Sequence, residues 1–231
     1  MVASFVHEIE KLVKGDYTLK KRIVLFLIAL SIQLIYIPTS NQTSGGIEPK
    51  LPIDVFPIWP IWVVPYVLCY PLWVAGAVWA IRKLEDRWYK AFVTATIVTF
   101  SIGALTFLLF PTYVPAATPV GDDIFATHLR TIHETWGRYA ALPSGHIYIT
   151  TLLALFLNRM YPRYRWVWFL GVVIVSLSTL FTAQHYILDV VTGYLAALAG
   201  YYAGLWRAGF YVVDNPPRKQ PSKRISTPST D

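Results

Sequence analysis

Apolar residues gather in six stretches along this chain, and polar or basic residues separate them. The stretches cover residues 23–38, 58–81, 91–112, 146–160, 165–183 and 188–213. A helix needs roughly 20 apolar residues to cross a bilayer, so the first and fourth stretches are expected to extend into their flanks. The pattern predicts an all-α integral membrane protein built as a bundle of six transmembrane helices.

Two polar segments flank the predicted bundle. Residues 1–22 precede it and are basic, whereas residues 214–231 are polar, basic and contain proline. A segment with the composition of residues 214–231 cannot bury enough apolar surface to fold by itself. We therefore expect a cytoplasmic N-terminal segment at 1–22, a membrane domain at 23–213 and a disordered cytoplasmic tail at 214–231.

The basic residues lie almost entirely beside alternate connections of the predicted bundle. Of the 20 Lys and Arg residues, 17 lie before the first stretch, between the second and third, between the fourth and fifth, or at and after the end of the last. Only Lys50, Arg130 and Arg138 lie in the other connections. Because cytoplasmic loops carry the excess of Lys and Arg, both termini are predicted to be cytoplasmic. The connections 39–57, 113–145 and 184–187 are then predicted to face the opposite side.

Composition supports a membrane protein and argues against a nucleic-acid binder. Hydrophobic residues make up 55% of the chain and charged residues 14%, where a soluble domain carries about a quarter. The mean hydropathy is +0.46. The formal net charge is +7, but these charges lie in short clusters between apolar stretches, which indicates membrane topology. Cys69 is the only cysteine, so no intrachain disulfide can form.

His185 and Asp189 form the first candidate for chemistry. They are four residues apart, so on a helix they would share one face. Asp189 could then accept the proton of one ring nitrogen of His185 and leave the other nitrogen free to attack phosphorus or to take a proton. The alternative is a polar pair that only packs two helices, although ionisable groups at membrane depth are usually functional.

The second candidate is His146, at the start of the fourth stretch. It follows Pro143, Ser144 and Gly145. Ser144 suits the N-cap of a helix, Gly145 allows close backbone approach, and free N–H groups at a helix N-terminus bind anions. His146 could protonate a leaving oxygen there. An ordinary helix start with an interfacial histidine is the alternative.

Topology joins the two candidates. The fourth and fifth stretches would form a hairpin that begins and ends on the non-cytoplasmic side, with His146 at its start and His185 at its end. Both imidazoles would therefore reach the same membrane face.

The pair of motifs, Pro143-Ser144-Gly145-His146 and then His185-x-x-x-Asp189, resembles the type 2 phosphatidic acid phosphatase superfamily. The second motif, with Gln184 before it and Gly193-Tyr194 after it, is closest to the branch of inositol phosphorylceramide and sphingomyelin synthases. The resemblance implies a six-helix, metal-independent lipid phosphatase or phosphotransferase that needs no cofactor. It implies His185 as the nucleophile, His146 as the acid and Asp189 as the orienting carboxylate.

The chain departs from that family's pattern where the phosphate would bind. An arginine expected six residues before the second histidine is Thr179 here, and the Lys and Arg-Pro expected after the third helix are absent. Arg138 is the best candidate replacement, because a guanidinium can bind two phosphate oxygens; Arg130 is a second. With Ser144, Gly145 and Thr179 they complete the predicted substrate-binding set.

Two further possibilities remain. His128, His133 and Glu134 could suggest a metal site, but no helical HExxH motif is present, and solvated loop residues are the better interpretation.

The function predicted from the two motifs is transfer of phosphate from a lipid to water or to a lipid hydroxyl at the outer membrane face. A non-catalytic lipid-binding or lipid-translocating protein is the alternative, and nothing favours a channel. The predicted partners are a lipid phosphate or phospholipid and the bilayer, with no nucleic acid.

Overall fold

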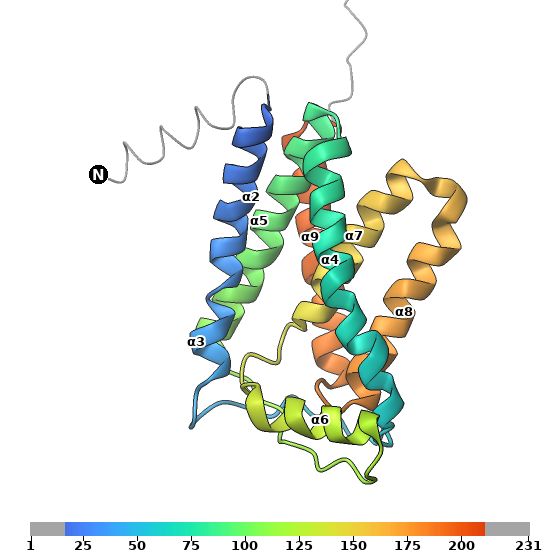
Figure 1. The fold of residues 1–231 in the computed structure, drawn as a ribbon. Coiled ribbons are helices and arrows are strands. Elements are labelled where there is room, and N and C mark those ends of the chain that lie inside the picture. The colour runs from blue at the N-terminus through green and yellow to red at the C-terminus, as the bar shows by residue number, and fades with distance from the viewer. Residues whose placement is uncertain (1–16, 211–231) are drawn as a thin grey trace, which may run out of the picture.

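The computed structural model describes residues 17–210, which form a bundle of α-helices (Figure 1). In chain order the elements are α2 (Leu19–Gln33), α3 (Tyr36–Ser40), the 3-10 turn η1 (Pro60–Trp62), α4 (Val63–Lys83), α5 (Asp86–Leu109), α6 (Ile124–Thr135), α7 (Gly145–Met160), the 3-10 turn η2 (Pro162–Tyr164), α8 (Arg165–Phe181) and α9 (Ile187–Arg207). Residues 17–210 contain no β-strand, which confirms the all-α class for this part. Most of the predicted segment 1–22 and all of the tail 214–231 lie outside the described residues.

A helix occupies each of the six predicted stretches. Five helical segments are long and apolar enough to cross a membrane, which indicates an integral membrane protein. These are Leu19–Ser40, Pro60–Lys83, Asp86–Leu109, Pro162–Phe181 and Ile187–Arg207. Helix α7 has 16 residues and is shorter than these segments, so the sixth span stays a prediction.

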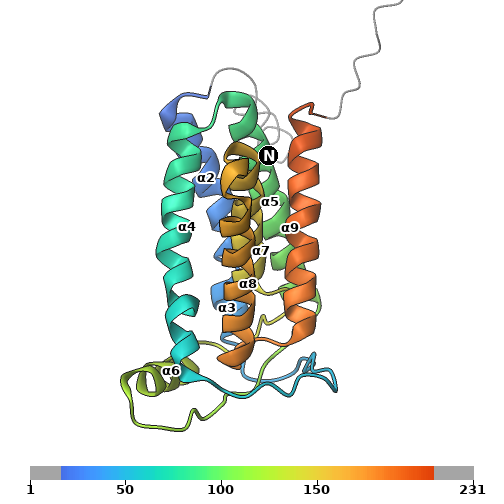
Figure 2. The same cartoon turned by 90° about the vertical axis from the view of Figure 1, so that its right-hand side faces the viewer.

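Small residues on α9 let it pack closely against α5, which lies beside it (Figure 2). A Cβ at Gly200 would lie 2.0 Å from Oγ1 of Thr99, and one at Gly204 would lie 2.3 Å from the carbonyl oxygen of Ala91. Apolar residues do not drive helices together inside lipid, so close approach at small residues supplies the packing instead. The neighbouring helix α7 packs between α8 and α9.

Arg22 joins the start of α2 to the turn between α4 and α5. Its guanidinium is buried and donates to the carbonyl oxygens of Ile81 and Leu84 at 2.9 and 2.7 Å. It also forms an ion pair of 2.6 Å with Asp86. Burying an arginine is costly unless each of its donors finds a partner, and these carbonyls satisfy that condition. The described ends of the chain therefore lie together at this end of the bundle (Figure 1).

Helix α6 lies across the opposite end of the bundle, where α4 and α9 begin (Figures 1 and 2). The sequence pattern predicted only a loop over 113–145. The carboxylate of Asp123 caps α6 by accepting from the N–H groups of Phe125 and Ala126. Buried Leu129 and Ile132 then pack its apolar face against η1 and α4. Its apolar residues alternate with polar ones at helical spacing and form no continuous apolar stretch, so a search for membrane-length stretches does not find this helix.

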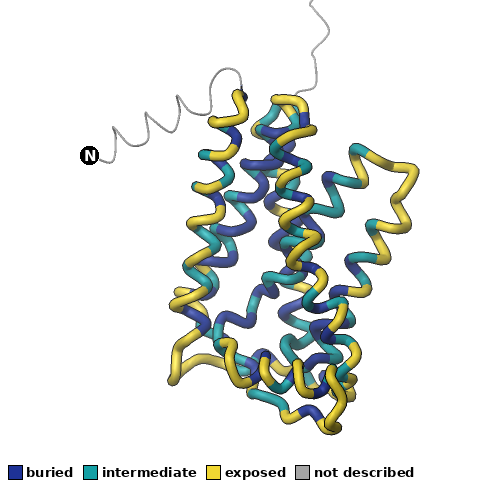
Figure 3. The backbone as a smooth tube through the Cα atoms, viewed as in Figure 1, coloured by how far each residue is buried: buried dark blue, intermediate teal, exposed yellow. Residues whose placement is uncertain are grey.

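The outward faces of α2, α4 and α8 are exposed along most of their length (Figure 3). They carry large apolar side chains such as Leu27, Leu72 and Phe169, each more than half exposed. A soluble monomer rarely exposes so continuous an apolar surface to water. In a bilayer the lipid tails cover such a surface, so it is not exposed to water. The pattern agrees with a bundle that stands in a bilayer.

Candidate active site

Three parts of the chain meet near α6: the N-terminus of α7, the turn after α8 and the first turn of α9. His146 is the second residue of α7, His185 lies in the turn, and Asp189 is the third residue of α9. The N–H of Ser144 donates to the carbonyl oxygen of Asp189 at 3.0 Å. That bond joins the start of α7 to the start of α9 and brings the two sequence motifs together.

Gly193 permits this close approach of α9 to α7. A Cβ at Gly193 would lie 2.8 Å from Cβ of Ile147 and 3.0 Å from the carbonyl oxygen of Ser144. Carbon atoms rest at 3.5–4.0 Å from one another, so a larger residue would push the helices apart. Gly193 therefore helps to set the distance between the two motifs.

His185 and Asp189 form a hydrogen-bonded pair. Nδ1 of His185 lies 3.2 Å from Oδ2 of Asp189, and the same oxygen accepts from the N–H of Tyr186 at 2.9 Å. Asp189 is fully buried, and its Oδ1 has no partner within residues 17–210. A carboxylate held in this way fixes the tautomer of the imidazole, with the proton on Nδ1. Nε2 of His185 then carries a lone pair for reaction.

Aromatic rings surround His146. Its imidazole stacks on Tyr66, with ring centroids 4.3 Å apart, and lies 5.4 Å from the ring of Trp73. Nε2 of His146 is 3.1 Å from the hydroxyl of Tyr70. The centroid of the His185 ring is 5.8 Å away. These contacts fix the orientation of the imidazole, and the two histidines are close enough to contact one small group together.

The N-terminus of α7 offers two backbone donors beside the histidines. Within residues 17–210 no acceptor binds the N–H of Gly145 or that of His146. Free N–H groups at a helix N-terminus attract anions. Gly145 has no side chain that would cover them.

A cavity of about 280 Å³, called here the histidine cavity, opens in front of both imidazoles. Besides Gly145, His146 and His185 it is lined mainly by aromatic and apolar side chains. Arg138 is its only lysine or arginine within the described part of the chain, and no Asp or Glu lines it. The cavity can therefore accept an anionic group of low charge.

Three members of the predicted substrate-binding set do not line this cavity. Arg130 is bound at the surface, where it forms an ion pair of 3.6 Å with Asp122. Thr179 is fully buried, and its carbonyl oxygen accepts from the N–H groups of Gln184 and His185. Ser144 holds the N-cap position of α7, but its buried hydroxyl has no partner within residues 17–210. Thr179 and Ser144 thus hold the backbone that carries the histidines.

The prediction that His133 is a solvated loop residue is wrong. His133 lies on α6 and is buried against the turn after α8. Its Nδ1 accepts from the N–H of Ala117 at 3.4 Å, so Nε2 carries the proton and donates to the carbonyl of Thr182 at 2.9 Å. The amide of Gln184 also lies 3.2 Å from Nδ1. Burial lowers the pKa of His133 below 6.5, and the charge of Arg138 lowers the pKa further. His133 thereby ties α6 to the turn that carries His185.

Asp54 is a further residue at the site whose role the sequence did not indicate. It is buried, and its carboxylate accepts from the N–H of Ile187 at 2.9 Å and from that of Leu51 at 2.7 Å. It therefore caps the first residue of α9, two residues after His185 in the chain. Only a capping pattern within one segment is visible in a sequence, and these partners lie far apart along the chain.

No group of three or more His, Cys, Asp or Glu side chains gathers within residues 17–210 in a way that could hold a metal ion. His128 and Glu134, which the sequence offered as possible metal ligands, are exposed on α6.

A profile of the PAP2 superfamily matches residues 59–203, which include both histidines and Asp189. The chain belongs to the PAP2 superfamily. Members of this superfamily are generally phosphatases or phosphotransferases, and membership suggests lipid phosphate chemistry for this chain. A comparison of the sequence with curated proteins gave no significant match. The resemblance found in the sequence is thus confirmed for the PAP2 superfamily, whereas the narrower synthase-like branch stays a prediction.

Proposed function

We propose that this PAP2 protein transfers the phosphate, or the phosphorylated headgroup, of a membrane lipid through a covalent intermediate on His185. The observation that carries the proposal is the arrangement of three side chains. Two imidazoles line one cavity with their ring centroids 5.8 Å apart, and a buried carboxylate binds Nδ1 of one of them. A nucleophile oriented by a carboxylate, with a second titratable group facing it, is the general pattern of covalent catalysis.

In the first step Nε2 of His185 attacks phosphorus, and the bond from phosphorus to the lipid oxygen breaks. His146 gives its proton to that departing oxygen. In the second step the oxygen of water or of a lipid hydroxyl attacks phosphorus, the bond from phosphorus to Nε2 of His185 breaks, and His146 takes the proton of the attacking group. Asp189 stabilises the positive charge that develops on the His185 ring.

The developing negative charge on the phosphoryl oxygens needs donors, typically worth a few kcal/mol each. Arg138 and the free N–H groups of Gly145 and His146 are the donors that we assign to the phosphoryl oxygens. Arg130 binds Asp122 instead and is assigned no part in this step.

The small number of cations favours a phosphodiester, which carries less charge than a monoester. This tilts the proposal toward transfer of a headgroup, in line with the synthase-like motif around Gln184 and Gly193. Hydrolysis remains the simpler outcome, because water needs no pocket of its own. No step of either reaction calls for a metal or a cofactor.

We further propose that α7 is the sixth span and that the site faces the non-cytoplasmic side. Basic residues from four separate segments lie at the end of the bundle where the described chain begins and ends, and the positive-inside rule assigns that end to the cytoplasm. Among residues 17–210, the exceptions are Lys50, Arg130 and Arg138, at the end that carries the histidine cavity. The layout of N-terminal segment 1–22, membrane domain 23–213 and tail 214–231 belongs to this proposal.

The test is turnover of the purified protein in detergent. Substrates are phosphatidic acid, a polyprenyl diphosphate, and a phospholipid with ceramide or diacylglycerol as acceptor. His185→Ala and His146→Ala are compared with His128→Ala, a matched change at an exposed histidine outside the histidine cavity. Acid-labile, alkali-stable labelling by a ³²P-labelled donor detects the phosphorylated histidine.

We expect turnover to vanish in His185→Ala and His146→Ala and to persist in His128→Ala. Phosphate release would identify a phosphatase, and headgroup exchange would identify a transferase. Turnover that survives His185→Ala refutes the covalent role of His185. A wild-type protein that binds these lipids and turns none of them over would instead support the lipid-binding alternative.

A further inference from the structure

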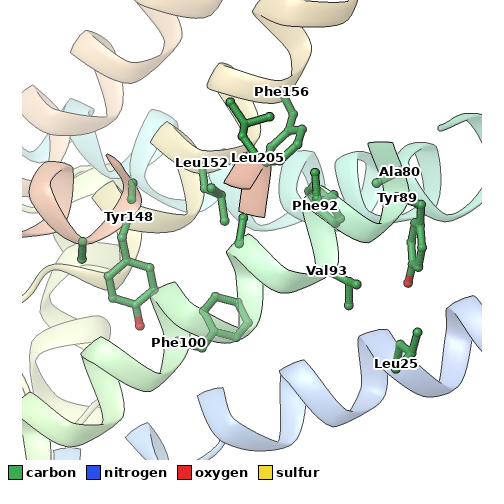
Figure 4. Close-up of a cluster of buried hydrophobic side chains, with 14 of the residues drawn as sticks. Leu25, Ala80, Tyr89, Phe92, Val93, Phe100, Tyr148, Leu152, Phe156 and Leu205 are labelled. Atoms are coloured by element: carbon green, nitrogen blue, oxygen red, sulfur yellow. The ribbon is translucent and has the colours of Figure 1, made fainter. Parts of the chain in front are cut away.

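A second cavity, called here the apolar chamber, lies between α2, α4, α5 and α7. It measures about 390 Å³. Each of these four helices contributes lining residues, among them Leu30 and Gln33 of α2, Ala77 of α4, Phe92 and Phe100 of α5, and Leu152 of α7. Three of the lining residues, Phe92, Phe100 and Leu152, belong to the cluster of buried apolar side chains drawn in Figure 4. No charged side chain of residues 17–210 lines the chamber, so an ionic headgroup would lose its hydration there without compensation.

The apolar chamber adjoins the histidine cavity. Both are lined by Leu30, Gln33, Tyr70, Trp73 and Ile149. A molecule whose polar end lies before the histidines can therefore extend its apolar part into the chamber without leaving the protein.

The chamber also borders the surrounding lipid. Val74 and Val78 line it and are nevertheless 65% and 47% exposed. Helix α2 packs mainly on α5, and α4 packs mainly on α7 and α8, so the contact between α2 and α4 is slight. A lipid can thus reach the chamber sideways from the bilayer between these two helices.

Gln33 stands at the boundary between the two cavities. Its Oε1 accepts from the hydroxyl of fully buried Tyr148 at 2.7 Å, which holds the amide in place. Within residues 17–210 no acceptor binds its Nε2. A polar donor without an acceptor at membrane depth is costly, and an oxygen of a bound lipid would satisfy it. Thr96, which also lines the chamber, already donates to the carbonyl of Phe92.

We propose that a hydrocarbon chain of the substrate lipid lies in the apolar chamber, and that Nε2 of Gln33 donates to the oxygen where this chain joins the headgroup. The inference rests on the proposed function, since it takes the histidine cavity as the place of the headgroup. It identifies the substrate as a lipid that enters from the bilayer with its chain attached. It also makes the residues of the chamber determinants of chain preference.

The test fills the chamber with a larger side chain. Ala77 lines the chamber, whereas Ala75 is exposed two residues earlier on α4 and lines neither cavity. Ala77→Phe and Ala75→Phe are compared on a long-chain lipid and on its short-chain, water-soluble homologue. We expect the ratio of kcat/KM for the long chain to that for the short chain to fall at least tenfold in Ala77→Phe. The same ratio should stay at the wild-type value in Ala75→Phe.

Equal ratios in Ala77→Phe and Ala75→Phe would overturn the chamber. Should Ala77→Phe fail to fold, Val78→Trp narrows the same chamber from a half-exposed position and is judged by the same ratio. A lipid with a photoreactive group at its chain end gives a readout independent of turnover. Labelling of α2 and α4 supports the chamber even if the protein proves inactive, and labelling confined to α8 or α9 refutes it.

The test of Gln33 also removes the hydroxyl of Tyr148, because that hydroxyl would lose its acceptor if Gln33 alone were replaced. Gln33→Leu combined with Tyr148→Phe is compared with Tyr148→Phe alone. We expect a rise in KM for the long-chain lipid of about tenfold, with kcat little changed, in the double variant only. An unchanged KM would remove Gln33 from the proposal.

Discussion

Gly193→Ala is expected to disable the site from a position that touches no substrate. The added Cβ would lie 2.8 Å from Cβ of Ile147 and 3.0 Å from the carbonyl oxygen of Ser144. Both contacts are with the first turn of α7, and neither belongs to the movable end of a side chain. The clash can therefore be relieved only if α7 and α9 move apart at their first turns, which carry His146 and Asp189.

The size of the effect follows from the clash. Contacts near 2.8 Å must open to at least 3.5 Å, a shift approaching 1 Å. Overpacking of this kind costs about 1–3 kcal/mol, and the higher helix propensity of alanine returns up to ~1 kcal/mol. A misplacement of about 1 Å between reacting groups costs on the order of 100-fold in rate. The rate should therefore suffer more than the fold.

The assay measures kcat/KM and the thermal midpoint in detergent for Gly193→Ala and for Gly171→Ala. Gly171 lies on α8 and has open space where a Cβ would stand. Gly171→Ala should leave turnover unchanged and stabilise the protein by about 0.5–1 kcal/mol, because glycine weakens a helix. Gly193→Ala should lose about 100-fold in kcat/KM while still purifying as a folded protein.

Wild-type turnover in Gly193→Ala would refute the reasoning, since it would mean that the distance between α7 and α9 does not control the histidines. A loss of turnover in Gly171→Ala of the same size would do so as well. The loss of turnover would then result from replacing any glycine of the bundle and would not be specific to Gly193.

Three further expectations concern charge and protonation. Asp189→Asn keeps a hydrogen bond to His185 but removes its charge, so kcat should fall about 10- to 100-fold by rate assay, whereas Asp122→Asn should have no effect. Arg138→Lys loses the two-pronged contact with phosphate, and its kcat/KM should fall about tenfold, while Arg130→Lys stays at the wild-type value. Burial lowers the pKa of His133 in the folded protein below that of a free histidine, near 6.5, so the unfolded chain binds this proton more tightly. The contribution of His133 to stability is therefore full above about pH 6.5 and should decline as the pH falls below it. Thermal melts from pH 8 to 5 should show this decline, and it should shrink in His133→Gln.

The sequence predicted the elements of this fold better than their contacts. The six apolar stretches each became a helix, with ends shifted by a few residues, because long apolar runs leave a membrane chain few alternatives to a helix. Helix α6 was not predicted, because its apolar residues alternate with polar ones and form no continuous apolar stretch. The burial of His133 could not be predicted either, since its partners Thr182 and Ala117 lie on other segments.

The candidate site divides in the same way. His146, His185 and Asp189 were chosen from residue type, spacing and the side of the membrane on which their segments begin. Arg138, selected only as an outward cation near His146, lies at the histidine cavity, whereas Arg130 lies away from it. The sequence offered no means of separating these two arginines, because the path of a loop depends on what it packs against.

The sequence by itself determined that this chain is a helical membrane protein of the PAP2 superfamily and which residues could carry its chemistry. Those properties follow from local composition, from apolar length and from short motifs. The tertiary structure alone decided how close the histidines lie, which cation faces them, and that an apolar chamber opens beside them. These depend on small residues such as Gly193 that let helices touch, and on buried polar bonds such as that between Gln33 and Tyr148. Each joins positions that are distant along the chain, so only packing in three dimensions can specify them.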